Sequence, residues 1–159
     1  MKPLVKKILI GTGIAMTVSA IVAYQKAMKI AAIFEAMDIE PAYLTDLDIN
    51  LNNKAASFKL DVRLTNNTAD DLFISGVSVA SLELLHIYYN NVFLATAKVN
   101  IKEIAIPSRN ELIIKAIPVT VSIANILKVG GSLLSFDMDK ITVIGVVSAL
   151  GNKYEIGTE

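Results

Sequence analysis

The first 40 residues carry an apolar pattern that predicts helix. Between Lys7 and Lys26 no side chain is charged, and this stretch, Ile8 to Gln25, is predominantly apolar. As a helix it would be about 27 Å long, close to the roughly 30 Å hydrocarbon core of a bilayer. Lysines at both ends are suited to reach the interfaces, and Tyr24 falls where an interfacial aromatic residue is expected. The pattern predicts a single transmembrane helix.

A cleaved signal peptide is the alternative interpretation of this stretch. Lys2, Lys6 and Lys7 form a basic segment before it, and Val18-Ser19-Ala20 or Ile21-Val22-Ala23 fits a small-residue cleavage site. We favour the anchor because an amphipathic pattern continues beyond either site. Basic residues are slightly more numerous on the N-terminal side, which favours a cytoplasmic N-terminus and an exported C-terminal domain.

Small residues recur at every fourth position of the predicted span: Gly11, Ala15, Ser19 and Ala23. In a helix these residues share one face, and small side chains let a second helix approach closely. The row predicts self-association through the membrane helix, although small residues are common in bilayer helices for other reasons.

The segment from Lys26 to Asp38 keeps a helical period. Its apolar stripe consists of Ile30, Ile33, Phe34 and Met37. Proline disfavours helix both at its own position and at the residue before it, so Pro41 is expected to end the helix. Residues 1–40 are therefore predicted to form a membrane helix followed by an amphipathic stalk, and residues 41–159 a separate domain.

After Pro41 the apolar period changes from about 3.6 to 2, which is typical of strands with one buried face. Asn90-Asn91 tolerates the positive φ angles of a tight hairpin turn, and Pro118 favours an edge strand or a bulge. A short helix is predicted from Ala124 to Leu134. We expect a mainly β fold, an antiparallel β-sandwich of about seven strands with one short helix, preceded by the long N-terminal helix. The strands are predicted at 47–51, 58–64, 77–89, 92–99, 111–123, 141–149 and 153–156, with a short apolar run at 72–74.

The order of these motifs resembles the folded late-embryogenesis-abundant branch, also called the WHy (water stress and hypersensitive response) domain. The similarity covers roughly residues 42–157. The matching elements are Phe58-Lys-Leu-Asp-Val-Arg-Leu64 before Asn66-Asn67-Thr68, Ile74-Ser-Gly-Val77, the hairpin from Ile87 to Ala95, Ile106-Pro-Ser108, Ile117-Pro-Val-Thr-Val121 before Asn125-Ile-Leu127, and Ile141-Thr-Val-Ile-Gly-Val146.

The resemblance implies a fibronectin-like β-sandwich, no enzymatic activity, and a role in stress protection or in cell envelopes. The family usually has Asn-Pro after its first strong strand, where this chain has Asn66-Asn67. Bacterial relatives are often tethered by a lipidated cysteine. Since this chain has no cysteine, its tether would have to be the Ile8 to Gln25 helix.

Composition narrows the function classes further. The 159 residues are 53% hydrophobic and carry 15 basic and 15 acidic side chains, so the chain is too apolar for a disordered protein. It is also too neutral to bind nucleic acid by neutralising phosphates. The absence of cysteine excludes disulfide frameworks, thiol nucleophiles and thiolate metal sites.

Few residues suggest chemistry. His86 is the one histidine, and its alternating surroundings predict a strand residue at a surface rather than a catalytic base. Three acidic pairs, Asp46 with Asp48, Asp70 with Asp71, and Asp137 with Asp139, offer oxygen ligands for Ca²⁺ but are better explained as turn or surface residues. Asn66-Asn67-Thr68 is also a glycosylation sequon. We predict no catalytic, cofactor-binding or metal-binding residue.

The expected function is that of a non-enzymatic single-pass membrane protein. Its partners would be the lipid bilayer and other proteins, either copies of itself or capsid or envelope proteins. Two settings fit: a cell-envelope or stress-protection protein, and a virion protein that links an internal membrane to its capsid. The alternative from another class is a soluble exported β-sandwich, released by signal cleavage, that binds a ligand or a protein.

Overall fold

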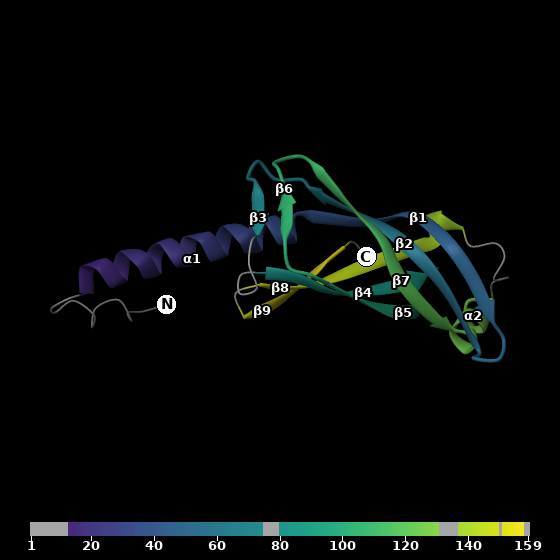
Figure 1. Cartoon of the computed structure of the whole chain (residues 1–159). Helices are drawn as coiled ribbons and strands as arrows, with labels where there is room; N and C mark the ends of the chain where they lie inside the picture. The colour runs from purple at the N-terminus through teal and green to yellow at the C-terminus, as the bar shows by residue number, and fades with distance from the viewer. Residues whose placement is uncertain (1–12, 75–79, 131–136, 150, 158–159) are drawn as a thin grey trace.

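The computed structural model describes residues 13–74, 80–130, 137–149 and 151–157 (Figure 1). A helix comes first, and most of the chain after it forms antiparallel strands. In chain order the elements are α1 (Gly13–Glu35), β1 (Met37–Asn50), β2 (Ala55–Asn66), β3 (Leu72–Ile74), β4 (Ala80–Tyr89), β5 (Val92–Ile101), β6 (Ile104–Ile106), β7 (Glu111–Ser122), α2 (Ile123–Lys128), a 3₁₀ turn (Met138–Lys140), β8 (Ile141–Ala149) and β9 (Asn152–Ile156).

The described strands form three antiparallel sheets. Their orders are β1-β2-β7, β3-β6 and β5-β4-β8-β9. The two larger sheets share one apolar core, to which Leu60 and Leu64 contribute from β2, Leu85 and Ile87 from β4, and Val147 from β8. The predicted mainly β fold with antiparallel strands and a short helix is confirmed.

The period-2 pattern of β2 places its apolar side chains inside. Phe58, Leu60, Val62 and Leu64 are buried, whereas Ser57 and Lys59 between them are exposed. A strand with one face against a core and one in water gives this alternation. The predicted strand from 58 to 64 is therefore confirmed, within a longer element.

Two local predictions in the strands are also confirmed. Asn90 and Asn91 have φ angles of 48° and 62° and join β4 to β5, as the tight turn requires. Pro118 lies in β7, which is an edge strand of its sheet. A bulge stands close to it, where Ala116 has a φ angle of 56° and donates its backbone N–H to Asp61 Oδ1 at 2.7 Å.

The predicted helical segment to Asp38 is wrong at its C-terminal end. Helix α1 ends at Glu35, and β1 begins at Met37, which pairs with Asn66. Pro41 does not stop a helix but lies within β1, next to a shift in its pairing with β2. A proline is tolerated there because β1 is an edge strand.

Two further boundaries differ from the prediction. The helix expected from Ala124 to Leu134 spans only Ile123–Lys128, and residues 131–134 lie outside the described part of the chain. Its last turn closes with Val129 and Gly130 donating to Ile126 and Leu127, and Gly130 has a φ angle of 64°. Such a left-handed residue commonly ends a helix. The described strands also number more than the predicted seven, because β3 and β6 pair as a small sheet of their own.

Candidate functional site

The C-terminal half of α1 packs against the β domain. Ile30, Ile33 and Phe34 are buried and belong to the same core as the sheets. The Phe34 ring stacks on that of Tyr154 in β9, with 5.9 Å between the ring centroids. An ion pair of 3.6 Å between Lys29 Nζ and Asp70 Oδ1 lies at the surface beside this contact. The predicted apolar stripe therefore binds the following domain.

The helix continues beyond this contact as a projecting arm (Figure 1). Its described side chains there include four large apolar or aromatic ones that no part of the described chain covers: Ile21 (56% exposed), Val22 (56%), Tyr24 (63%) and Met28 (56%). Lys26 and Lys29 lie where this arm meets the docked half, on either side of Met28. One continuous helix thus has a segment buried in protein and an apolar segment that lacks a protein partner among the described residues.

The predicted membrane span is only partly within the described residues. It starts at Ile8, whereas the description begins at Gly13, and no described helix is long and apolar enough to cross a membrane. Of the predicted helix-packing face, Gly11 lies outside the described residues. Ala15, Ser19 and Ala23 lie in α1, where only their backbone is described.

His86 lies in β4 on the outer side of its sheet. Its Nδ1 is 2.9 Å from Thr96 Oγ1 on the neighbouring strand β5, and its ring lies beside that of Phe93. These contacts are those of a strand residue at a surface. The described part of the chain places no acidic residue in hydrogen-bond contact with His86.

The three acidic pairs do not converge on one point, and most of their members already have partners. Asp46 Oδ2 lies 2.6 Å from Lys59 Nζ, and this hydrogen bond, with the attraction between the charges, raises the pKa of Lys59. Asp71 accepts the Ser108 N–H, and Asp137 accepts the Asp139 N–H and pairs with Lys140. Among the described residues no group of three or more His, Asp and Glu side chains is placed to hold a metal ion.

Asn66, at the end of β2, is a buried polar residue with none of its surface exposed. Its Nδ2 donates to the carbonyls of Asp70, Ile106 and Pro107 at 2.8, 3.1 and 3.3 Å, and its Oδ1 accepts the N–H and the hydroxyl of Thr68. A glycan on this nitrogen would be incompatible with these hydrogen bonds and with the burial of the side chain. The alternation of β2 contains part of the signal for this role, because position 66 continues the buried face of Phe58, Leu60, Val62 and Leu64. The carbonyl partners of Asn66 lie in other segments and have no such signal.

Comparison with known proteins does not assign the chain to a family. No family model matches the chain, and no curated protein matches it. Among solved structures it is similar to a protein from Archaeoglobus fulgidus, with 7% sequence identity and a TM-score of 0.34 over 76% of this chain and 98% of that one. A likeness at that level carries no argument about fold or function.

Proposed function

We propose that this chain is a non-enzymatic single-pass membrane protein. The N-terminal helix inserts in the bilayer, and a fibronectin-like β-sandwich of WHy type, held at the membrane surface by the docked half of α1, makes structural contacts with other proteins. Two biological settings fit this role: the internal membrane of a virion, or a cell envelope. Self-association through Gly11, Ala15, Ser19 and Ala23 is part of the proposal.

The observation that carries the proposal is the division of α1 at Lys26 and Lys29. On the C-terminal side of this point one face of the helix is buried against the β domain. Toward the N-terminus Ile21, Val22 and Tyr24 are more than half exposed. Leaving large apolar side chains in water costs roughly 1.5–3 kcal/mol each relative to burial, so a helix face of this kind favours lipid or another helix. The uncharged sequence from Ile8 continues the same apolar character toward the N-terminus.

Extraction of membranes with alkaline carbonate tests the insertion of the full chain. We expect the wild-type chain to stay in the pellet. Met16→Lys places a charge at the middle of the predicted span, where insertion of a lysine costs about 3 kcal/mol, and should move a large share of the protein to the supernatant. Leu127→Lys makes the same change at an exposed position of α2 and should leave the chain in the pellet.

Release of the wild-type chain into the supernatant would contradict the proposal. The intact mass of the mature protein separates the exported alternative from it, because signal cleavage would remove about 20 to 23 residues.

A further inference from the structure

Strand β5 of one larger sheet lies next to strand β7 of the other, but no backbone hydrogen bonds connect the two strands. Each strand is an edge: within the described residues β5 is hydrogen-bonded only to β4, and β7 only to β2. Between them lies a cavity of about 240 Å³ that opens to the surface, which we call the β5–β7 cleft. It is lined by Lys98, Val99, Ile101, Ile114, Lys115, Ala116, Ile117 and Pro118.

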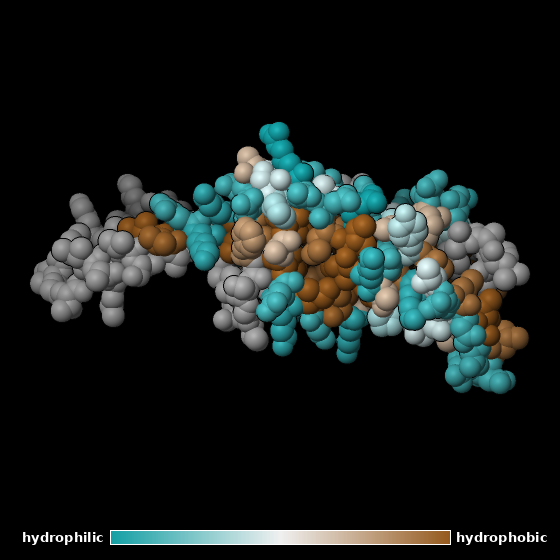
Figure 2. Space-filling model, turned by 45° about the horizontal axis from the view of Figure 1, so that its top comes forward, coloured by the Kyte–Doolittle hydropathy of each residue, from teal (hydrophilic) through white to brown (hydrophobic). Residues whose placement is uncertain are grey.

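The floor of the β5–β7 cleft is an incompletely covered part of the core. Val99, Ile101 and Ile114 are half-buried and pack against the core cluster, and Ile117 below them is buried. Figure 2 shows apolar side chains gathered on this part of the surface with hydrophilic side chains around them. Apolar surface that is open to water and bordered by polar groups is typical of a site for an apolar ligand.

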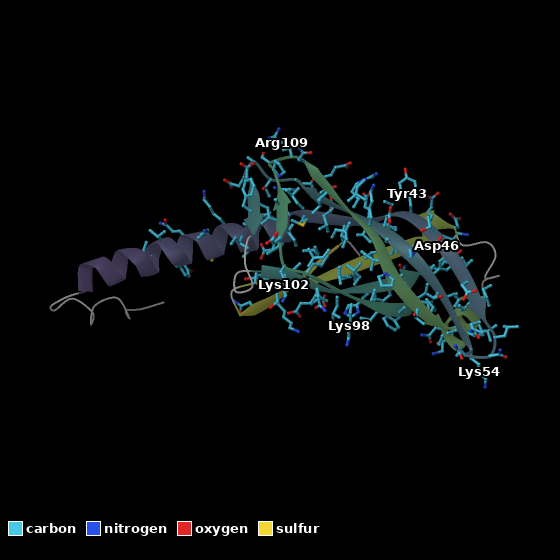
Figure 3. All side chains as sticks on the ribbon, in the orientation of Figure 1. Tyr43, Asp46, Lys54, Lys98, Lys102 and Arg109 are labelled. Atoms are coloured by element: carbon cyan, nitrogen blue, oxygen red, sulfur yellow. The ribbon has the colours of Figure 1, made fainter. Side chains whose placement is uncertain are left out.

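The rim of the cleft carries two lysines, and the carboxylate of Asp61 lies beside it at Ala116. Lys98 on β5 and Lys115 on β7 are exposed and stand on opposite sides of it, and no lining residue is acidic. Figure 3 shows Lys98 projecting from its strand. In the described part of the chain neither ammonium group has a carboxylate within 4.0 Å. The cleft therefore combines an apolar floor with two unpaired positive charges.

The backbone of both edges is poorly suited to adding a peptide strand. Pro118 has no N–H, and the N–H of Ala116 is already donated to Asp61. On β5, Asn100 has a φ angle of 52°, which interrupts the extended edge between Val99 and Ile101. Natural edge strands are protected from pairing by such bulges and prolines, so recognition here depends on side chains.

We propose that the β5–β7 cleft binds a long-chain fatty acid. The carboxylate lies between the ammonium groups of Lys98 and Lys115, and the alkyl chain covers Val99, Ile101 and Ile114. The volume is below the 300–1,000 Å³ common for ligand pockets, which suits part of one alkyl chain rather than a two-chain lipid. This inference goes beyond the proposed function and does not depend on insertion of α1.

Photolabelling of the full chain tests the proposal. The protein is placed in phosphatidylcholine vesicles with palmitic acid carrying a diazirine on its chain, irradiated, digested and analysed by mass spectrometry. We expect labels on the peptides that contain Val99, Ile101 and Ile114. The double variant Lys98→Glu/Lys115→Glu should lower this labelling about tenfold, the effect of about 1.4 kcal/mol.

Two controls isolate the role of charge. Lys54→Glu/Lys128→Glu makes the same change in charge at exposed residues outside the cleft and should leave the labelling unchanged. A diazirine-bearing palmityl alcohol has the same chain without the carboxylate, and its weaker labelling should not respond to Lys98→Glu/Lys115→Glu.

The outcomes separate this inference from the proposed function. Labels on α1 alone would support membrane insertion and overturn the fatty-acid site. Labels on β5 and β7 without any on α1 would support the site and count against insertion. Equal labelling of the cleft in wild type and Lys98→Glu/Lys115→Glu would also overturn the proposal, because the lysines would then hold no carboxylate.

Discussion

Asn66 joins the end of β2 to two other parts of the chain through one buried amide group. Its Nδ2 binds three backbone carbonyls, and its Oδ1 binds Thr68. A buried polar group that loses its partner costs about 1–3 kcal/mol. Because the carbonyls of Asp70, Ile106 and Pro107 all accept from this one amide group, the Asn66 side chain holds the segment after β2 against the end of β6.

Replacement of Asn66 by alanine should therefore strongly destabilise the β domain. We expect a loss of about 3 kcal/mol in the free energy of unfolding, because buried carbonyls lose their donor. Asn67→Ala is the matched control, since Asn67 is exposed and its side chain donates to Asp38 at the surface. Urea denaturation in a non-ionic detergent, followed by circular dichroism, measures both. Equal losses for the two variants would contradict the role given to Asn66.

The Lys59–Asp46 pair gives a prediction about pH. Hydrogen bonding to Asp46 and its negative charge raise the pKa of Lys59 above its ordinary 10.5. The stabilisation is complete below the unfolded-state pKa and is lost as pH rises through the higher folded-state pKa. Asp46→Asn should return the Lys59 pKa to its ordinary value in an NMR titration, whereas Asp48→Asn should leave it raised. No change with Asp46→Asn would exclude the pair as the cause.

At the scale of elements, strands with one buried face could be predicted from sequence because their pattern is local. The alternation of Phe58 to Leu64 defines the core face of β2, and Asn90-Asn91 defines the turn between β4 and β5. Each signal lies within a few residues and depends on no distant partner. The existence and approximate bounds of most strands follow from such signals.

The end of α1 and the β5–β7 cleft could not be predicted in this way. Met37 and Phe34 are three residues apart, so Met37 fits the helical stripe although it lies in β1. Pro41 is compatible with a helix end and with a bulged edge strand alike. The cleft arises from the order of strands in two sheets, which brings Val99 and Ile114 together across 15 positions of sequence without hydrogen bonds between their strands.

The docking of α1 on the β domain gives a prediction for Phe34. This side chain is 1% exposed and stacks on Tyr154. Phe34→Ala should lower the free energy of unfolding by about 3 kcal/mol, the usual cost of a large cavity. Tyr24→Ala, on the projecting arm, should change it by less than about 0.5 kcal/mol. The same denaturation assay compares them, and a small effect of Phe34→Ala would mean that α1 is not an integral part of the core.

At the scale of the whole molecule, the two described helices lie at opposite ends of an elongated body (Figure 1). At the α2 end Leu127 is 71% exposed. With α1 in a bilayer, this end would face away from the membrane. The proposed insertion of α1 therefore predicts a different distance from lipid for each end of the body.

Fluorophores on single cysteines measure these positions, because the natural chain has no cysteine. In vesicles with quencher groups on the lipid chains, a fluorophore on Ile21→Cys should be strongly quenched and one on Leu127→Cys should not. A fluorophore on Phe73→Cys, on β3 near the docked half of α1, should be quenched less than the first. Strong quenching at Leu127→Cys would mean that the body lies along the bilayer.

The junction between α1 and β1 has a mechanical consequence. A single residue, Ala36, separates the helix from the strand, and both flanking elements belong to one core. The junction therefore has no linker in which tilt could be absorbed. If α1 is inserted as proposed, a change in the inclination of the helix would move the whole β domain with it, and the displacement would be largest at the distant α2 end.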